Sequence, residues 1–265
     1  MSAAVPKGKG GVNRDALPRY PDGSQWWPPG LGRDASDDQL TAALRGAWGT
    51  PRWVLDLALD VRELLGGPAA TLGFDLDAGT RPGTHSWELS RTRLDGCFGD
   101  DDALLRDWYD CASEARGLTE TTSVTTFMGD HITVAHGSTS VAWSVWCNFP
   151  FSDPKPWVAR AIRAARDGCW VSILAPHTTG SWWDDLEGAA LATVRLRRVE
   201  FEACPGLLDA AGRPARGDRP SQQCSLVTLA PADVAPPAAA ITLRRDIHRL
   251  GHAKFTIQPG PGLSG

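Results

Sequence analysis

The sequence predicts an α/β fold, with a mostly parallel β-sheet and helices on both of its faces. Segments with apolar residues at helical spacing alternate along the chain with short apolar runs of strand length. This alternation is typical of a parallel sheet that helices cover. The chain has 265 residues, of which 42% are hydrophobic and 22% are charged. It is therefore long enough and apolar enough to bury a sizeable core.

The clearest helix is predicted at residues 50–67. Its apolar residues recur at i, i+3 and i+4 spacing, Pro51 stands at a helix start, and two glycines follow the last turn. Residues 154–168 have a similar design, with proline near the start and Gly168 at the end. Weaker patterns predict further helices at 36–48, where Ser36 is a candidate cap, and at 101–115 and 181–192.

Short apolar runs between these helices predict five strands. They lie at 70–79, 141–147, 169–176, 193–201 and 224–231. Residues 116–140 are rich in Thr, Ser and Gly and are expected to form an irregular insertion that could contain a hairpin. Residues 203–223 are expected to form a loop, because they are rich in Gly, Pro and charged residues.

These elements define one expected domain at residues 36–231. The preceding residues 1–35 are rich in Gly, Pro and polar residues and are expected to be a loosely ordered arm. The segment 232–265, which contains Pro-Pro and Pro-Gly-Pro-Gly pieces, is expected to be a peripheral tail.

Composition argues against several classes of protein. The formal net charge of −4 does not favour a generally basic, nucleic-acid-coating surface. The six cysteines form no C-x-x-C pair, and His248 and His252 have no third ligand beside them, so we expect no metal site. No run of about 18 apolar residues occurs, and no signal sequence stands at the start, so we expect no membrane segment and free thiols in a reducing cytoplasm.

The tetrapeptide Asn-Phe-Pro-Phe at 148–151 directly follows the predicted strand 141–147. In open α/β sheets, ligands bind beyond the carboxyl ends of the strands. This pattern suits methyl transfer to the exocyclic amine of a nucleobase, whose lone pair is delocalised into the ring. The side-chain oxygen of Asn148 and the main-chain carbonyl of Phe149 would accept hydrogen bonds from the amine and favour its tetrahedral transition state.

The other two residues of the tetrapeptide would support the same chemistry. Pro150 would stiffen the loop, and the ring of Phe151 would stack on a base extruded from its helix. The alternative interpretation is structural, since a turn asparagine and a core phenylalanine need no function.

Short motifs surround this tetrapeptide in a definite order: W-x-T-P at 48–51, F-D-L-D-A at 74–78, D-D-A-L at 101–104 with a Trp four residues on, W-C-N-F-P-F-S at 146–152, P-W-V at 156–158, L-A-P-H-T-T-G-S-W-W at 174–183 and R-V-E-F at 198–201. In this order the chain resembles the phage-type DNA adenine N6-methyltransferase family over about residues 46–230. The resemblance implies a Rossmann-like sheet, S-adenosylmethionine as cofactor, double-stranded DNA as substrate, no metal, and the cytoplasm of a bacterial host cell.

The resemblance also assigns site residues. Asn148, Phe149, Pro150 and Phe151 occupy the N-P-P-Y position of the family. Thr50 and Pro51 fall where the family places a Thr-Pro beside the methionine moiety of the cofactor. Asp77, Ala78 and Gly79 fall where it carries an Asp-Pro-x-x-Gly-like turn near the same cofactor.

Asp75 is an equally placed rival of Asp77. We expect the two acids to alternate across the strand, so that only one of them can face the ligand. Either acid could instead be a solvated or helix-capping side chain.

Two departures from the family keep other functions open. Phe149 replaces the first proline of N-P-P-Y, which keeps the carbonyl acceptor but is expected to loosen the loop. Ribosomal RNA adenine dimethyltransferases also have an apolar residue there. The glycine turn at 77–80 is shorter than usual. The alternatives are therefore another nucleobase amine, in RNA or at cytosine N4, or a catalytically silent module with the same fold.

Several further segments have weaker expectations. Segments 116–140 and 203–223 are candidates for target recognition. The arginines at 195–198, at 213–219 and at 244–249, with Lys254, could hold phosphates or form a solvated face. His177 and the two threonines after it could line a base pocket, or a Thr or Ser could cap the next helix. Residues 153–157, Asp-Pro-Lys-Pro-Trp, are expected to start the helix 154–168.

Overall fold

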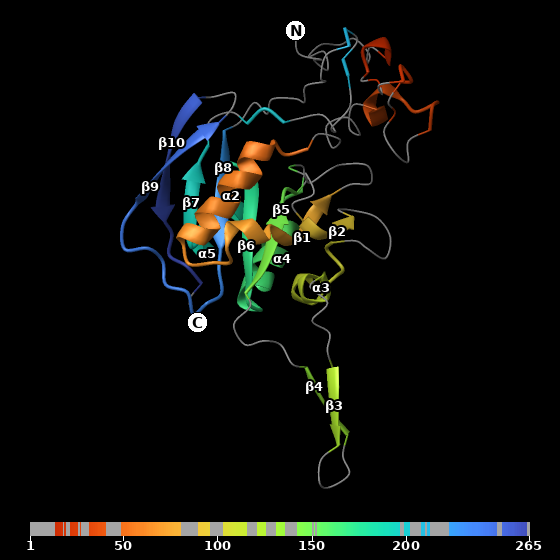
Figure 1. The fold of residues 1–265 in the computed structure, drawn as a ribbon. Coiled ribbons are helices and arrows are strands. Elements are labelled where there is room, and N and C mark those ends of the chain that lie inside the picture. Colours follow the sequence, from red (N-terminus) through yellow and green to blue (C-terminus); the bar gives the residue numbers. More distant parts are fainter. Residues whose placement is uncertain are drawn as a thin grey trace.

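A computed structural model of the chain describes most of the predicted domain (Figure 1). The described residues are 14–17, 19, 22–25, 27, 32–40, 49–80, 90–95, 103–115, 121–125, 131–135, 142–149, 151, 153–196, 199–201, 208–209, 211–212, 223–247 and 251–263. Of the predicted site residues, only Pro150 lies outside them. Also outside are most of the arginines proposed to hold phosphates, together with His248 and the side chain of His252.

The main sheet has eight described strands in the order β2-β1-β5-β6-β8-β7-β10-β9. In chain order these are β1 Phe74–Thr80, β2 Ser90–Asp95, β5 Trp143–Cys147, β6 Cys169–Pro176, β7 Ala192–Arg195, β8 Cys224–Leu229, β9 Ile241–Ile247 and β10 Gly251–Pro259. Strands β2, β1, β5 and β6 are parallel. Strand β8 runs antiparallel to both β6 and β7, so β7 points in the same direction as β6.

The α/β class is confirmed, but the sheet is mixed rather than mostly parallel. Three of its neighbouring pairs are parallel, and four are antiparallel: β6–β8, β8–β7, β7–β10 and β10–β9. Strand β8, which lies reversed between β6 and β7, accounts for two of these four antiparallel pairs. Apolar runs show that a segment is a buried strand but not which way it points, so the sequence pattern could not have revealed this reversal.

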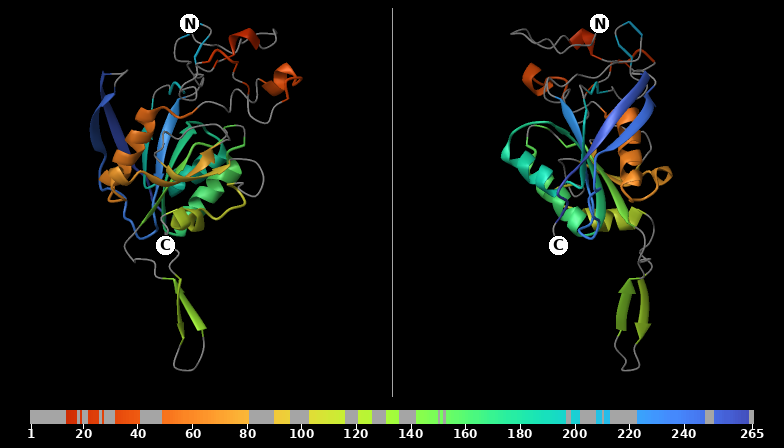
Figure 2. Two further views of the ribbon diagram at one scale, coloured as in Figure 1. Left: turned by 45° about the vertical axis from the view of Figure 1, so that its right-hand side comes forward. Right: turned by 90° about the vertical axis from the view of Figure 1, so that its left-hand side faces the viewer.

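Helices cover both faces of the sheet (Figure 2). Helix α2, Arg52–Leu64, packs on one face against β6 and β8. Helices α4, Lys155–Arg166, and α5, Ser181–Ala189, pack on the other face. Helix α3, Trp108–Ala115, packs against β1 and β5. No helix among the described residues has both the length and the apolar content needed to span a membrane.

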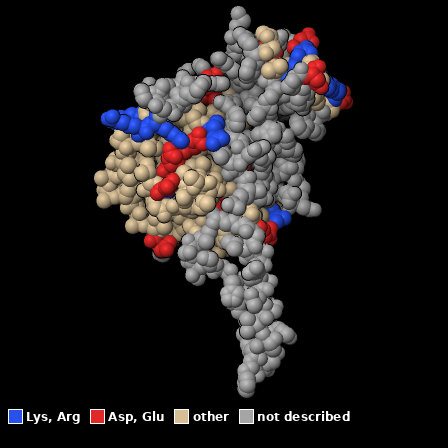
Figure 3. Space-filling view, viewed as in Figure 1, with Lys and Arg blue, Asp and Glu red and all other residues tan. Residues whose placement is uncertain are grey.

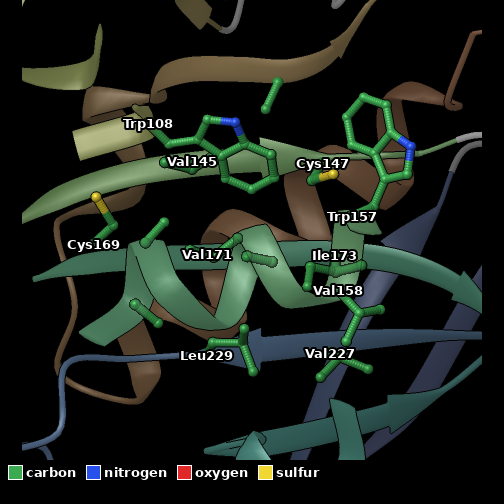
Figure 4. Close-up of a cluster of buried hydrophobic side chains, with 14 of the residues drawn as sticks. Trp108, Val145, Cys147, Trp157, Val158, Cys169, Val171, Ile173, Val227 and Leu229 are labelled. Atoms are coloured by element: carbon green, nitrogen blue, oxygen red, sulfur yellow. The ribbon is translucent and has the colours of Figure 1, made fainter. Parts of the chain in front are cut away.

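The core consists of two main apolar clusters, one on each face of the sheet. The larger joins α3, α4 and α5 to alternate residues of β5 and β6, including Val145, Cys147 and Ile173 (Figure 4). The other joins α2 to Trp146, Leu174 and the inward side chains of β7 and β8. Burial on both faces explains why the β5, β6 and β8 segments are almost entirely apolar.

The C-terminal segment, expected to be a peripheral tail, supplies two strands at one edge of the main sheet. Strand β10 pairs with β7, and β9 pairs with β10 over seven residue pairs. Ile257 is fully buried against the α2 face. The segment 1–35, expected to be a loosely ordered arm, also makes packed contacts, since Leu17 and Ala35 are buried.

Candidate functional site

The strand order places a topological switch point at the carboxyl ends of β1 and β5. Strand β1 is followed along the chain by β2 on one side of it, whereas β5 is followed by β6 on the other side. The chain order therefore reverses between β1 and β5. At such a switch point, the loops that leave the two strands diverge and open a crevice. The predicted cofactor turn ends β1, and the predicted catalytic tetrapeptide follows β5.

The side chains of Asn148 and Thr50 are hydrogen-bonded to each other, although the two residues are 98 positions apart in the sequence. The amide Nδ2 of Asn148 donates to the hydroxyl oxygen of Thr50 at 2.9 Å. Thr50 is buried, whereas Asn148 is partly exposed. Among the described residues, none is found to donate to the Asn148 side-chain oxygen. The amide is thus held at one end and keeps an acceptor at the other.

Pro51 fixes the place of Thr50 by starting helix α2. Pro51 has a φ of −60° and an extended ψ, as is typical of a residue that directly precedes the first turn of a helix. Its carbonyl accepts from the backbone N–H of Val54 at 2.9 Å. Because the next turns of α2 bury Val54 and Leu57, the Thr-Pro segment is anchored at the edge of the sheet.

Gly79 lets the end of β1 approach the backbone of Asn148. A Cβ at this position would lie 2.8 Å from the Asn148 carbonyl oxygen and 3.0 Å from its nitrogen. Real Cβ atoms essentially never come within 3.0 Å of other heavy atoms, so only glycine fits here. The sequence resemblance assigned Gly79 to the cofactor, and the structure adds that it makes room for Asn148.

Replacing Gly79 by alanine is expected to displace the Asn148 backbone, so any reaction that depends on Asn148 should slow at least about tenfold. The matched control is Gly188→Ala, because nothing lies within 4 Å of a Cβ at that helical position. In α5 this control should be neutral or slightly stabilising. Initial rates and thermal melting of the two variants check the prediction, and equal rates would contradict it.

The expectation that only one of Asp75 and Asp77 can face a ligand rested on placing them on opposite sides of the strand, and that placement is wrong. Residues two apart on a strand share a face, and both acids are buried, so they differ in their partners and in their place along β1. Asp75 is fully buried, and its carboxylate accepts from the backbone N–H and the hydroxyl of Ser144, at 2.9 and 3.0 Å. It therefore ties β1 to β5, which is a structural role.

Asp77 lies two residues closer to the carboxyl end of β1. Its Oδ1 accepts from the backbone N–H of Gly79 at 3.2 Å, a local turn typical of aspartate before glycine. Ala78 between them is fully buried in the core, so only its backbone can face the edge of the sheet.

The two phenylalanines of the tetrapeptide have different environments. Phe149 is buried, and its ring stacks on Trp157 and meets Phe151 and Trp182 edge-on, with centroids 6.1 to 6.5 Å apart. Phe151 is half-buried and contacts Phe201 at 6.3 Å. We expected the missing proline to loosen this loop; instead, the ring of Phe149 anchors it in the core.

Trp182 and Phe201 were not singled out by the sequence analysis, yet they border the tetrapeptide. Both are half-buried. Twelve tryptophans in 265 residues hinted at an aromatic site, but tryptophan serves cores equally well. Only the fold shows which rings gather at the ligand edge.

The thiol beside the tetrapeptide is inert. Cys147 is fully buried next to Trp157 (Figure 4). Burial raises the pKa of Cys147 well above its ordinary value, and the negative charge of Asp77 raises it further. Burial likewise raises the pKa of Cys224 to about 11. The free cysteines among the described residues are all buried, so none offers a thiolate nucleophile near neutral pH.

Basic and acidic side chains are mixed on the described surface (Figure 3). Arg195, Arg244 and Lys254 are exposed. Arg245 pairs with Asp60 at 3.0 Å, and burial raises the pKa of Asp60 although Arg245 opposes this shift. Among the described side chains, no group of three His, Cys, Asp or Glu residues is placed to hold a metal ion.

His177 lies after β6 at the ligand edge, as expected. Its ring meets Trp183 edge-on at 4.9 Å, and Nδ1 lies 3.4 Å from the Ser225 hydroxyl. The alternative, that a Thr or Ser caps the next helix, is wrong, because α5 is preceded by Gly180 with no side-chain cap. The expectation that residues 153–157 start a helix is confirmed, since α4 follows Pro154.

The two candidate recognition segments lie at different places. Segment 116–140 contains a hairpin of β3, Thr121–Thr125, and β4, His131–Ala135, which projects away from the body (Figure 1). Along the chain this hairpin precedes the amino end of β5, whereas Asn148 follows the carboxyl end of that strand. Segment 203–223 follows β7 at the ligand edge, and Leu208 exchanges two backbone hydrogen bonds of 2.8 Å with Arg19.

Comparisons with known proteins provide no relative for this site. No protein-family model, no curated protein and no solved structure matches the chain.

Proposed function

We propose that this chain is an S-adenosylmethionine-dependent methyltransferase with a Rossmann-like sheet, acting on adenine N6 of a flipped base in DNA. The convergence of three distant segments carries the proposal. Thr50, Gly79 and Asn148 meet at the switch point of the sheet. The sequence resemblance assigns the three segments to the same reaction from motif order alone, independently of the contacts between them.

The residues at this edge fit S-adenosylmethionine. Gly79 lets the end of β1 lie against the Asn148 backbone, which brings the predicted cofactor turn beside the predicted catalytic residue. The Asp77 carboxylate at the strand end can accept from an amino group or a ribose hydroxyl. Pro51 completes the rim at the start of α2. When bound, this cofactor supplies an electrophilic methyl group on a sulfonium sulfur.

The tetrapeptide is suited to hold the accepting amine. The Asn148 side-chain oxygen and the Phe149 carbonyl would accept its two N–H groups, which directs the nitrogen lone pair away from the ring and towards the methyl carbon. The amine would accept the methyl group directly, the bound cofactor would leave as its neutral thioether, and the surplus proton would pass to water. Preorganised acceptors of this kind act mainly on the transition state.

The inert thiol at position 147 favours direct transfer. A mechanism through a covalent enzyme–base adduct needs a reactive nucleophile at the site. Cys147 is buried and its pKa is raised well above the ordinary value. Attack by the amine itself requires no such group.

Two measurements test the function. Calorimetry with S-adenosylmethionine should show binding to one site, and methyl incorporation should occur into double-stranded DNA, with N6-methyladenine identified by mass spectrometry. Incorporation into RNA or at cytosine N4 would redirect the proposal to another nucleobase amine. Absence of cofactor binding would reject it in favour of a silent binding module.

Replacing Phe151 by alanine is expected to weaken the binding of an extruded adenine. Stacking of an aromatic ring on a base contributes about 1–3 kcal/mol, so the KM for DNA should rise about 5- to 150-fold. Phe151→Tyr, which keeps the ring, should remain near the wild-type value. Steady-state kinetics with a single-site duplex measures the effect. If Phe151→Ala keeps the wild-type KM while it folds normally, the ring only packs.

A further inference from the structure

We infer that Thr50 is a positioning residue that orients the amide of Asn148, rather than a cofactor contact. This inference rests on the proposed function. The Thr50 hydroxyl accepts the hydrogen bond that Asn148 Nδ2 donates at 2.9 Å. The side-chain oxygen of Asn148 is thereby left as the acceptor for the substrate amine.

An asparagine amide needs such a partner to act as an acceptor. Its oxygen and nitrogen ends have nearly the same shape but opposite hydrogen-bonding character. An amine that presents N–H groups is bound by the oxygen end and repelled by the NH2 end. A hydroxyl can accept from the NH2 end or donate to the oxygen end. In this structure it accepts from Nδ2, so the oxygen end is the one that is left for the substrate.

The surroundings make this bond effective. Thr50 is 6% exposed, so water competes little for its hydroxyl. Pro51 and the first turn of α2 hold Thr50 from one side. Gly79 lies against the Asn148 backbone, where even a Cβ would come within 3.0 Å. The asparagine is therefore held through its side chain by one segment and through its backbone by another.

The two possible roles of Thr50 predict different kinetics. A hydroxyl that contacts the cofactor changes the Kd of S-adenosylmethionine when it is removed. A hydroxyl that orients Asn148 changes the rate of the chemical step and leaves cofactor binding unchanged.

The test compares Thr50→Val, which keeps the shape without the hydroxyl, with Thr50→Ser, which keeps the hydroxyl. We expect Thr50→Val to lower kcat about tenfold while the Kd of S-adenosylmethionine and the KM for DNA stay within about twofold. Thr50→Ser should restore most of kcat. Thr228→Val is the matched control, because that buried hydroxyl on β8 has no hydrogen-bond partner among the described residues.

Three outcomes would overturn the inference. One is an unchanged kcat in Thr50→Val. A second is a weaker Kd for the cofactor with an unchanged kcat, which would assign Thr50 to the cofactor. The third is a serine variant no more active than valine. Failure of the proposed function itself is distinguishable, because the wild-type protein would then transfer no methyl group.

Discussion

Replacing Asn148 by alanine is expected to lower kcat for methyl transfer about 10²- to 10³-fold while the Kd of S-adenosylmethionine stays unchanged. The loss of one preorganised group that acts in the transition state has an effect of this size. The fold should tolerate the change, since Asn148 is partly exposed. Its bond to Thr50 contributes only about 1 kcal/mol to stability.

Single-turnover rates with a defined duplex, together with cofactor calorimetry, measure this effect. Asn148→Asp keeps an acceptor oxygen and should therefore retain more activity than alanine. Gln258→Ala removes an exposed amide on β10, far along the sheet, and should behave as wild type. A rate for Asn148→Ala within a few-fold of wild type would remove the central argument for catalysis at this edge.

The strongly patterned elements of the fold could be predicted from the sequence. Helices α2 and α4 have apolar residues at regular helical spacing, and β6 occupies the predicted range Cys169–Pro176. Strands β2, β9 and β10 were not predicted. The first two are edge strands, and their Ser-Arg-Thr-Arg and Leu-Arg-Arg stretches are too polar to be recognised as strands.

Part of the candidate site could also be predicted. Motif order suggested that Thr50, Gly79 and Asn148 belong to one reaction, but only the fold shows that Asn148 lies against both of the others. The structural role of Asp75 could not be predicted, because its partner Ser144 is 69 residues away. The anchoring role of Phe149 could not be predicted, because its aromatic neighbours Trp157 and Trp182 come from separate helices.

One buried arginine connects the two segments that carry the rim of the site. Arg62 in α2 is fully buried. It donates to the carbonyls of Pro68, Ala69 and Gly73 at 2.9–3.0 Å and lies over the ring of Phe74, 5.3 Å from its centroid. It therefore ties the end of α2 to the turn that enters β1. The start of that helix carries Thr50, and the end of that strand carries Gly79.

Replacing Arg62 by methionine is expected to lower the free energy of unfolding by at least about 3 kcal/mol. Three carbonyls would lose a charged donor, and each such bond contributes about 1.5–3 kcal/mol, less where water reaches the turn. Against a typical total of about 5–15 kcal/mol, this is a large share. Urea denaturation of the variant measures it.

Two further variants distinguish the effect of the Arg62 hydrogen bonds on stability from the effect of its positive charge. Arg62→Lys keeps the charge but not the planar fork, so it should recover only part of the stability. Arg163→Met removes an arginine with 68% of its side chain exposed and should cost less than about 1 kcal/mol. If Arg62→Met proves as mild as Arg163→Met, the turn before β1 must be held by other contacts. The approach of Gly79 to Asn148 would then depend on the sheet alone.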